Sequence, residues 1–401
     1  MINKKNTKRI YLDHAASTPI DQGVAKLMSQ AFLEYFGNPS SISNEGVEAK
    51  KILERCRTQV SEILGTRSKH IIFTGGATEA DTLALLGVIN QYKKEFKIKP
   101  HVIVSAIEHS AIYDLVSSLY VDGEIDLTVL PVDSTGIINP KDLRDKINSH
   151  TAFVSVHYAN NEIGTIEPIR EIAKEIRHYK RHNNPNSNYP VFHTDASQAP
   201  NYLDLKVDPL GIDLMTLSSS KIYGPKGVGA LYIKQGIKLV PLYLGGNQEF
   251  GIRAGTENVP LILGFTSALE ISEKLKNRES KRLLTLKKYF IAKLKSLGTE
   301  VVINNSLENT LPNIINFTLP QFRSEVIVLY LDSRGISVGL RSACKSTDEE
   351  VSHVLKAIGK DENILGEIGS IRVSMGRSTT KANMDTLLRE LKNTIKILSD
   401  K

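Results

Sequence analysis

The sequence predicts an α/β protein with a mainly parallel sheet, followed by a smaller α+β region at its C-terminal end. Short apolar runs alternate with amphipathic helical patterns through the first two-thirds of the chain. This alternation is typical of a parallel sheet covered by helices on both faces. From about Pro260 a long stretch rich in Lys and Leu replaces the alternation. A chain of 401 residues also exceeds the ~250–300 residues at which single cores stop growing, so we expect two domains.

The elements of the first region follow from local patterns. Residues 46–64 predict a helix whose apolar residues, Cys56 among them, fall on one face, which makes Cys56 a core residue. The Asn-rich segment 178–190 indicates an exposed loop. Short apolar runs predict strands at 71–73, 102–104, 127–130, 153–156, 191–193 and 230–233.

The C-terminal region has a different pattern of predicted helices and strands. Residues 260–297 predict a long helix, and short strands are predicted at 314–317 and 371–373. The chain closes with an amphipathic helix whose apolar side is formed by Met384, Leu387, Leu388, Leu391 and Ile395.

Composition and charge narrow the class of protein. The formal charge of +7 is mild for this length, so we expect no direct nucleic-acid binding, although a phosphate-bearing ligand or an acidic partner such as tRNA stays open. No apolar signal region follows Arg9, and no apolar run approaches the ~20 residues that span a bilayer, so we expect no membrane segment. Two cysteines cannot form a disulfide framework. The expected location is the cytoplasm, and no metal site is expected.

Two motifs at predicted strand ends are suited to an anionic ligand and to amine chemistry. The Gly-rich turn at 74–79 places backbone amides and Thr78 at a helix start, which suits a phosphate or is simply a tight turn. Lys221 follows three serines and precedes a Gly/Pro-rich turn. A lysine can form a Schiff base where its surroundings lower the amine pKa. A surface lysine beside a turn is the alternative.

Two further motifs carry a carboxylate and a thiol. Asp195 ends a strand with Gln198 three residues on, and the alternative is a helix N-cap. Cys344 lies in a polar stretch, where the neighbouring Arg341 and Lys345 would favour its thiolate.

Taken together and in order, nine segments resemble the cysteine desulfurase branch of the class V aminotransferase family of fold-type I pyridoxal-phosphate enzymes. The resemblance implies a large cofactor-binding domain over residues 16–260. It also implies a small domain over 1–15 and 261–401 that carries Cys344 and Arg372, and a homodimer. The segments are 11–19, 37–41, 108–109, 160–165, the Asp195 and Lys221 motifs, 251–258, 342–344 and 371–374.

The resemblance assigns roles to individual residues. Lys221 would hold pyridoxal 5′-phosphate as a Schiff base and later move protons, Asp195 would pair with the ring nitrogen, and His109 would stack on the ring and act as acid or base. Gln198 and Asn161 would hydrogen-bond the ring hydroxyl or the substrate. The phosphate would be held by Ala77, Thr78, Ser218 and Ser220, with Thr256 reaching across from the other subunit; the substrate would meet Arg372, Asn161 and Asn38.

The implied reaction takes sulfur from L-cysteine. The Cys344 thiolate would attack the substrate sulfur, which leaves L-alanine and a Cys344 persulfide for an acceptor such as an iron–sulfur scaffold protein or a tRNA-thiolating enzyme. Another class V enzyme, a selenocysteine lyase or a C–S lyase, is the alternative, and an inactive partner in sulfur trafficking is a third.

Several positions depart from the family pattern. Ser220 and Ser43 stand where the family commonly has histidines, Gly75 replaces a common serine, and Phe250 replaces a common arginine. Leu340-Arg341 stands where Ser-Gly is usual. Because a serine hydroxyl donates without charge, Ser220 predicts weaker cofactor binding than histidine.

Overall fold

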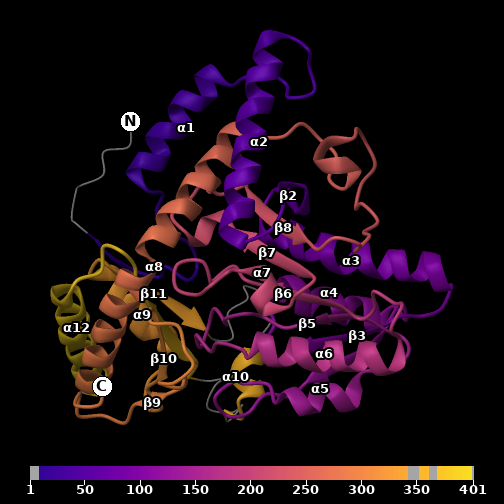
Figure 1. Ribbon diagram of the computed structural model, residues 1–401. Helices are drawn as coiled ribbons and strands as arrows, with labels where there is room; N and C mark the ends of the chain where they lie inside the picture. Colours follow the sequence, from indigo (N-terminus) through magenta and orange to yellow (C-terminus); the bar gives the residue numbers. More distant parts are fainter. Residues whose placement is uncertain (1–8, 342–351, 361–367, 400–401) are drawn as a thin grey trace.

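The computed structural model describes residues 9–341, 352–360 and 368–399, and its centre is a seven-stranded sheet (Figure 1). The strand order is β2-β8-β7-β6-β5-β3-β4. The strands are β2 (Ile71–Thr74), β3 (His101–Ser105), β4 (Asp126–Leu130), β5 (Thr151–Ser155), β6 (Val191–Asp195), β7 (Leu214–Ser218) and β8 (Gly229–Ile233).

The direction of the strands confirms the mainly parallel sheet. β4, β3, β5, β6 and β7 run parallel, and β8 lies antiparallel between β7 and β2. All six strands predicted for this region are present. The unpredicted strand is β7, whose sequence Leu-Met-Thr-Leu-Ser contains a single β-branched residue and so gives a weak strand signal.

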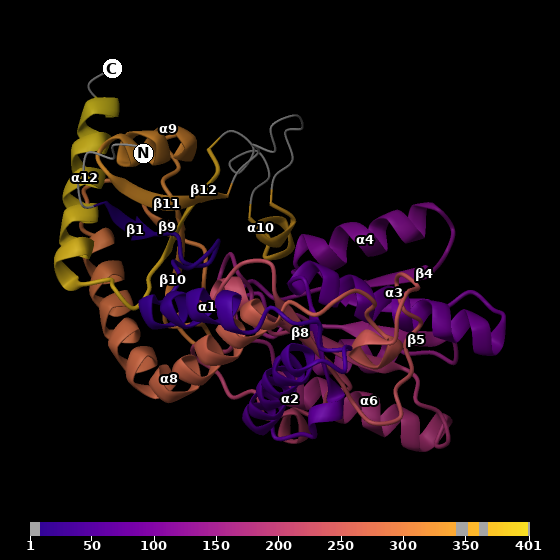
Figure 2. The same ribbon diagram turned by 90° about the horizontal axis from the view of Figure 1, so that it is seen from above.

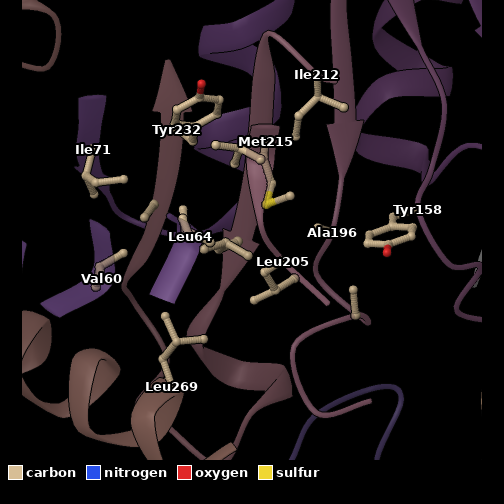
Figure 3. Close-up of a cluster of buried hydrophobic side chains, with 14 of the residues drawn as sticks. Val60, Leu64, Ile71, Tyr158, Ala196, Leu205, Ile212, Met215, Tyr232 and Leu269 are labelled. Carbon is tan, nitrogen blue, oxygen red and sulfur yellow. The ribbon is translucent and has the colours of Figure 1, made fainter. Parts of the chain in front are cut away.

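Helices cover both faces of the large sheet. α3 and α4 pack on one face of the sheet and form one hydrophobic core with it. α2, α6 and α8 pack on the other face and form the larger core, part of which Figure 3 shows in close-up. The helices before the C-terminal region are α1 (Gln22–Glu34), α2 (Asn44–Leu64), α3 (Ala77–Phe96), α4 (Ser110–Val121), α5 (Pro140–Lys146), α6 (Ile169–Asn183), α7 (Val207–Leu210) and α8 (Val259–Leu294).

α2 confirms the predicted helix and gives Ser43 a structural role. The Ser43 hydroxyl caps the helix by accepting from the Gly46 amide at 3.3 Å. Cys56 is fully buried among apolar neighbours, as predicted.

α6 corrects the loop predicted at 178–190. The helix continues to Asn183, and the irregular segment begins only at Asn184. The last turn of this helix contains the basic residues Lys180, Arg181 and His182. Because cations stabilise the carbonyl end of a helix, these polar residues belong to the helix and not to a loop.

A second sheet of five strands lies in the C-terminal region and has the order β1-β11-β12-β10-β9. β1 pairs parallel to β11, and the other neighbours are antiparallel. The strands of this sheet are β1 (Ile10–Leu12), β9 (Val302–Ile303), β10 (Ile314–Thr318), β11 (Ile336–Arg341) and β12 (Ser370–Ser374). The helices that follow α8 in the chain are α9 (Ser324–Ser333), α10 (His353–Ala357) and α12 (Lys381–Ser399).

The two sheets are linked by α8 and by the N-terminal strand. α8 contacts α1 and α2 beside the large sheet and α12 beside the small one (Figures 1 and 2). The apolar side predicted for the last helix is confirmed, with Met384, Leu387, Leu391 and Ile395 buried. The division at residues 15 and 260 stays a prediction. Within the described ranges, no helix is both long and apolar enough to cross a bilayer.

Candidate active site

A cavity of about 330 Å³ opens where strands of the large sheet end. Its lining comes from the segments that follow β2, β3, β5, β6 and β7, the edge at which open α/β sheets bind ligands. Nine of the predicted site residues line it: Ala77, Thr78, His109, Asn161, Asp195, Gln198, Ser218, Ser220 and Lys221.

One end of the cavity is a Gly-rich turn at the start of α3. Gly76 has φ 151°, and nothing lies within 4 Å of a Cβ built on it. A Cβ on Gly229 would lie 2.9 Å from the backbone carbon of Gly76, so β8 approaches this turn as only glycine allows. Glu79 accepts a hydrogen bond from the Gly75 amide at 2.8 Å and forms an ion pair with Arg253. These two contacts stabilise the turn.

Lys221 ends the short 3₁₀ turn Ser219–Lys221 that follows β7. Its Nζ donates to the backbone oxygen of Ala16 in the N-terminal segment. Nearby, the hydroxyls of Ser218 and Ser220 lie 3.1 Å apart. The turn therefore directs one amine and two hydroxyls to the same cavity.

Asp195 is the last residue of β6 and is buried. Its Oδ1 accepts from the Ser197 amide at 2.8 Å, and its Oδ2 lies 3.7 Å from Nε2 of His157. Burial acts to raise the pKa of Asp195, but the imidazoles of His157 and His109 and the Ser197 amide outweigh it and lower the pKa. Turns rather than a helix follow Asp195, so it is not the N-cap considered as its alternative.

Two other buried carboxyls near Asp195 are shifted the opposite way. Burial, followed by the charge of Asp195, raises the pKa of Asp81 well above its usual value. Burial likewise raises the pKa of Glu108 to about 7, although Ser105 and the His157 amide donate to it. Negative charge at neutral pH therefore concentrates on Asp195, beside the cavity.

His109 caps α4 through its ring. Nδ1 accepts from the Ala111 amide at 3.1 Å, which leaves the proton of a neutral ring on Nε2. Gln198 donates from Nε2 to the backbone oxygen of Ala15 at 3.0 Å. The loop that carries Asn161 is shaped by Asn160, whose Oδ1 accepts from the Glu162 and Ile163 amides.

Arg372 lies on β12 of the small sheet and is 2% exposed. Its Nη1 donates to the backbone oxygen of Asn161 at 2.9 Å, and its Nη2 pairs with Asp13 at 2.7 Å. Arg372 thus contacts a cavity residue through the Asn161 backbone but is not itself part of the cavity lining.

Besides Arg372, two predicted site residues in the described ranges are not gathered around this cavity. Asn38 and Thr256 are exposed and lie outside its lining, so their roles stay predictions. Cys344 lies outside the described residues, as does Lys345.

Sequence reasoning missed two residues that the structure brings to the site. His157 lines the cavity next to Asp195, and its position just after a predicted strand end is the signal that was available. Asp13 lies inside the segment 11–19, which indicates no separate role for it, and it pairs with Arg372.

The aminotransferase class-V family model matches residues 10–387. The chain belongs to the class V aminotransferase family. Among members of this family, "Cysteine desulfurase IscS" of Dictyoglomus turgidum is 40% identical over 393 residues, which cover 98% of this chain and 95% of that protein. "Cysteine desulfurase IscS 1" of Archaeoglobus fulgidus is 38% identical, covering 97% of each.

Solved structures are also similar to this chain. A "NIFS-like protein" matches with a TM-score of 0.88 and 32% identity over 97% of this chain and 100% of that one. A second, described as "SspA in complex with cysteine", matches with a TM-score of 0.77 and 32% identity over 91% and 98%. The predicted fold class and family are confirmed.

Proposed function

We propose that this chain is a cysteine desulfurase that removes sulfur from L-cysteine and carries it as a persulfide on Cys344. The observation that carries the proposal is the convergence of Lys221, Asp195, His109 and the Gly-rich turn on one cavity. Relatives named cysteine desulfurase, similar over nearly the whole chain, support the same activity.

The cavity fits pyridoxal 5′-phosphate by the chemistry of its donors. At one end, the Gly-rich turn, Thr78 and two serine hydroxyls offer neutral donors at the start of α3, where a phosphate is favoured. Elsewhere in the lining, the lowered pKa of Asp195 supplies an anion for a protonated ring nitrogen. Lys221 supplies the amine, and 330 Å³ suits a ligand of this size.

When bound, pyridoxal phosphate supplies an aldehyde for the amine of Lys221 and a ring that withdraws electrons from the substrate Cα. Asp195 keeps its charge at the ring nitrogen because the two imidazoles favour its anion. Lys221 would hold and return the proton at the substrate Cα. His109 lines the cavity and is the second proton donor in this proposal.

Arg372 binds the substrate carboxylate in this proposal. Its guanidinium is held in place by Asp13 and by the Asn161 backbone, so the residue is oriented before substrate arrives. Asn161 and Asn38 complete the contacts proposed for the substrate.

The sulfur step belongs to Cys344. Its thiolate forms a bond to the substrate sulfur while the substrate C–S bond breaks. The electron pair of that bond passes to the carbon, which takes up a proton to give L-alanine, and the sulfur stays on Cys344 as a persulfide. The persulfide then passes to a thiol acceptor protein, an iron–sulfur scaffold or a tRNA-thiolating enzyme, in the cytoplasm.

A homodimer completes the proposal. Apolar side chains are exposed at the end of α1 and just beyond it, with Phe36 72% and Ile42 fully exposed. Gathered exposed apolar groups typically mark a protein interface. Thr256 is exposed and outside this subunit's cavity, as expected for a residue that contributes to the partner's site.

The test is to reduce the purified holoenzyme with borohydride and map the modified lysine by peptide mass spectrometry, alongside L-alanine formation from L-cysteine. We expect the adduct on Lys221, and neither adduct nor alanine in Lys221→Ala. A modified lysine elsewhere, or alanine formation by Lys221→Ala, would overturn the proposal.

A further inference from the structure

The backbone just after Lys221 adopts a conformation that needs support. Tyr223, two residues on, has φ 66°, a left-handed value that residues with a side chain rarely adopt. Its amide donates to Thr18 Oγ1 at 2.7 Å, and its carbonyl oxygen accepts from the Asp21 amide at 2.9 Å. Such a conformation persists only where surrounding contacts hold it, so the contacts of Tyr223 help to set the path of the Lys221 loop.

Arg377 contacts Tyr223 in two ways. Its guanidinium carbon lies 4.0 Å from the centre of the Tyr223 ring, and its amide donates to the Tyr223 hydroxyl at 2.8 Å. The Arg377 side chain is largely buried, a setting in which a cation attracts an aromatic face more strongly. Arg377 comes three residues after the end of β12, the strand that carries Arg372.

A second route leads from Arg377 to the backbone of Lys221 itself. Arg377 Nη2 donates to the hydroxyl of Ser272 on α8 at 2.9 Å. The single proton of that hydroxyl is within reach of Asn201 Oδ1 at 3.0 Å and of the Ala268 carbonyl at 2.9 Å. Asn201 Nδ2 in turn donates to the Lys221 carbonyl oxygen at 2.8 Å.

The segment around Arg377 is itself held firmly. Arg282 of α8 donates to the carbonyl oxygens of Gly376 and Thr379, at 2.9 and 2.6 Å. Gly376 packs so closely on the ring of His14 that an added Cβ would lie 2.3 Å from His14 Cε1. The position of Arg377 therefore follows the position of the small sheet.

We propose that Arg377 is a positioning residue for Lys221, which ties the loop of the reactive amine to the strand that carries Arg372. The inference rests on the role proposed for Lys221 and extends it to a residue that does not line the cavity. Fixing the amine relative to the carboxylate-binding arginine matters because a misplacement of ~1 Å can cost roughly 100-fold in rate.

The experiment compares Arg377→Ala and Arg377→Lys with Arg389→Ala, an exposed arginine on α12 that serves as the matched control. Each apoprotein is titrated with pyridoxal 5′-phosphate across pH, and the adduct on Lys221 is trapped with borohydride and quantified. Then kcat and KM for L-cysteine are measured per trapped cofactor. If Arg377→Ala does not fold, Ser272→Ala and Tyr223→Phe replace it in the comparison. Each of them removes one hydrogen bond to Arg377.

We expect Arg377→Ala to shift the pH midpoint of trapping and to lower kcat about ten-fold, with KM changed less than about two-fold. Arg377→Lys should recover part of both effects, and Arg389→Ala should match the wild type. The inference would be overturned if Arg377→Ala folds and has the same pH midpoint of trapping and the same kcat as Arg389→Ala. Wild type without a Lys221 adduct would instead refute the proposed function.

Discussion

Arg372 and Asp13 form an ion pair in which Arg372 Nη2 lies 2.7 Å from Asp13 Oδ1, joining β12 to the segment after β1. Asp13 orients the guanidinium that we propose for the substrate carboxylate. We expect Arg372→Ala to lower kcat/KM for L-cysteine by about 100-fold, the scale of a lost charge-assisted hydrogen-bond pair.

Asp13→Ala should lower kcat/KM for L-cysteine about ten-fold, because the Arg372 guanidinium loses its orientation. Asp13→Asn, which keeps an acceptor oxygen, is the control, and equal losses in both Asp13 variants would contradict the orienting role.

Glu108 makes the stability of the protein depend on pH. Burial raises its folded-state pKa to about 7 from the ordinary glutamate value of 4.5, so its contribution to stability is fully present below pH 4.5 and is lost as pH rises toward 7. Relative to Glu108→Gln, wild type should lose about 3 kcal/mol of unfolding free energy across that interval.

Urea unfolding of the two proteins at pH 5 and pH 8 checks this expectation. Glu300→Gln, at an exposed carboxyl, is the control and should leave the pH dependence of wild type unchanged. A difference between wild type and Glu108→Gln that stays constant with pH would show that Glu108 does not titrate in this interval.

Ser220 is expected to limit the affinity for the cofactor. A charged imidazole at this position would replace a neutral donor with a charge-assisted one, a gain of ~1 kcal/mol. We expect Ser220→His to lower the Kd for pyridoxal 5′-phosphate about five-fold, measured by titrating apoprotein. Ser218→Ala, which removes the hydroxyl 3.1 Å from Ser220 Oγ, should raise that Kd. An unchanged or higher Kd in Ser220→His would contradict the prediction.

Thr256 is proposed to act in the site of the other subunit, which mixed dimers can test. A heterodimer of Lys221→Ala and Thr256→Ala chains contains one site with both residues intact if Thr256 acts across the interface. If Thr256 acts within its own subunit, neither site is intact. We therefore expect co-expressed, differentially tagged heterodimers to exceed both parent homodimers in alanine formation. Activity no higher than that of the Thr256→Ala homodimer would place Thr256 in its own subunit's site.

Much of this arrangement was predictable because ligand-binding residues of an α/β sheet follow its strands. Asp195 is identified by its position after a predicted strand, and Lys221 by the three serines before it and the Gly/Pro-rich turn after it. The fold adds that β7 and β6 are neighbours. His157 was missed because it follows an apolar run and reads as core. Its distance to Asp195 depends on the pairing of β5 with β6, which a single sequence does not reveal.

The contacts with the small sheet were the least predictable. Asp13 and Arg372 are 359 residues apart, and their ion pair requires β1 to join a sheet formed by the end of the chain. The link from Arg377 to Lys221 passes through Ser272 and Asn201, which carry no local signal of function. Local patterns identify reactive groups, whereas the groups that hold them in place depend on long-range packing.

The most direct test of the central claim is a single turnover of holoenzyme with one equivalent of L-cysteine, measuring L-alanine and the mass of the peptide that contains Cys344. The account predicts one alanine per active site and an added sulfur on Cys344 in wild type, with neither product in Cys344→Ala. Alanine formed by Cys344→Ala would contradict the role of that thiol. Sulfide released together with pyruvate and ammonia, by wild type and Cys344→Ala alike, would contradict the account as well and identify a C–S lyase instead.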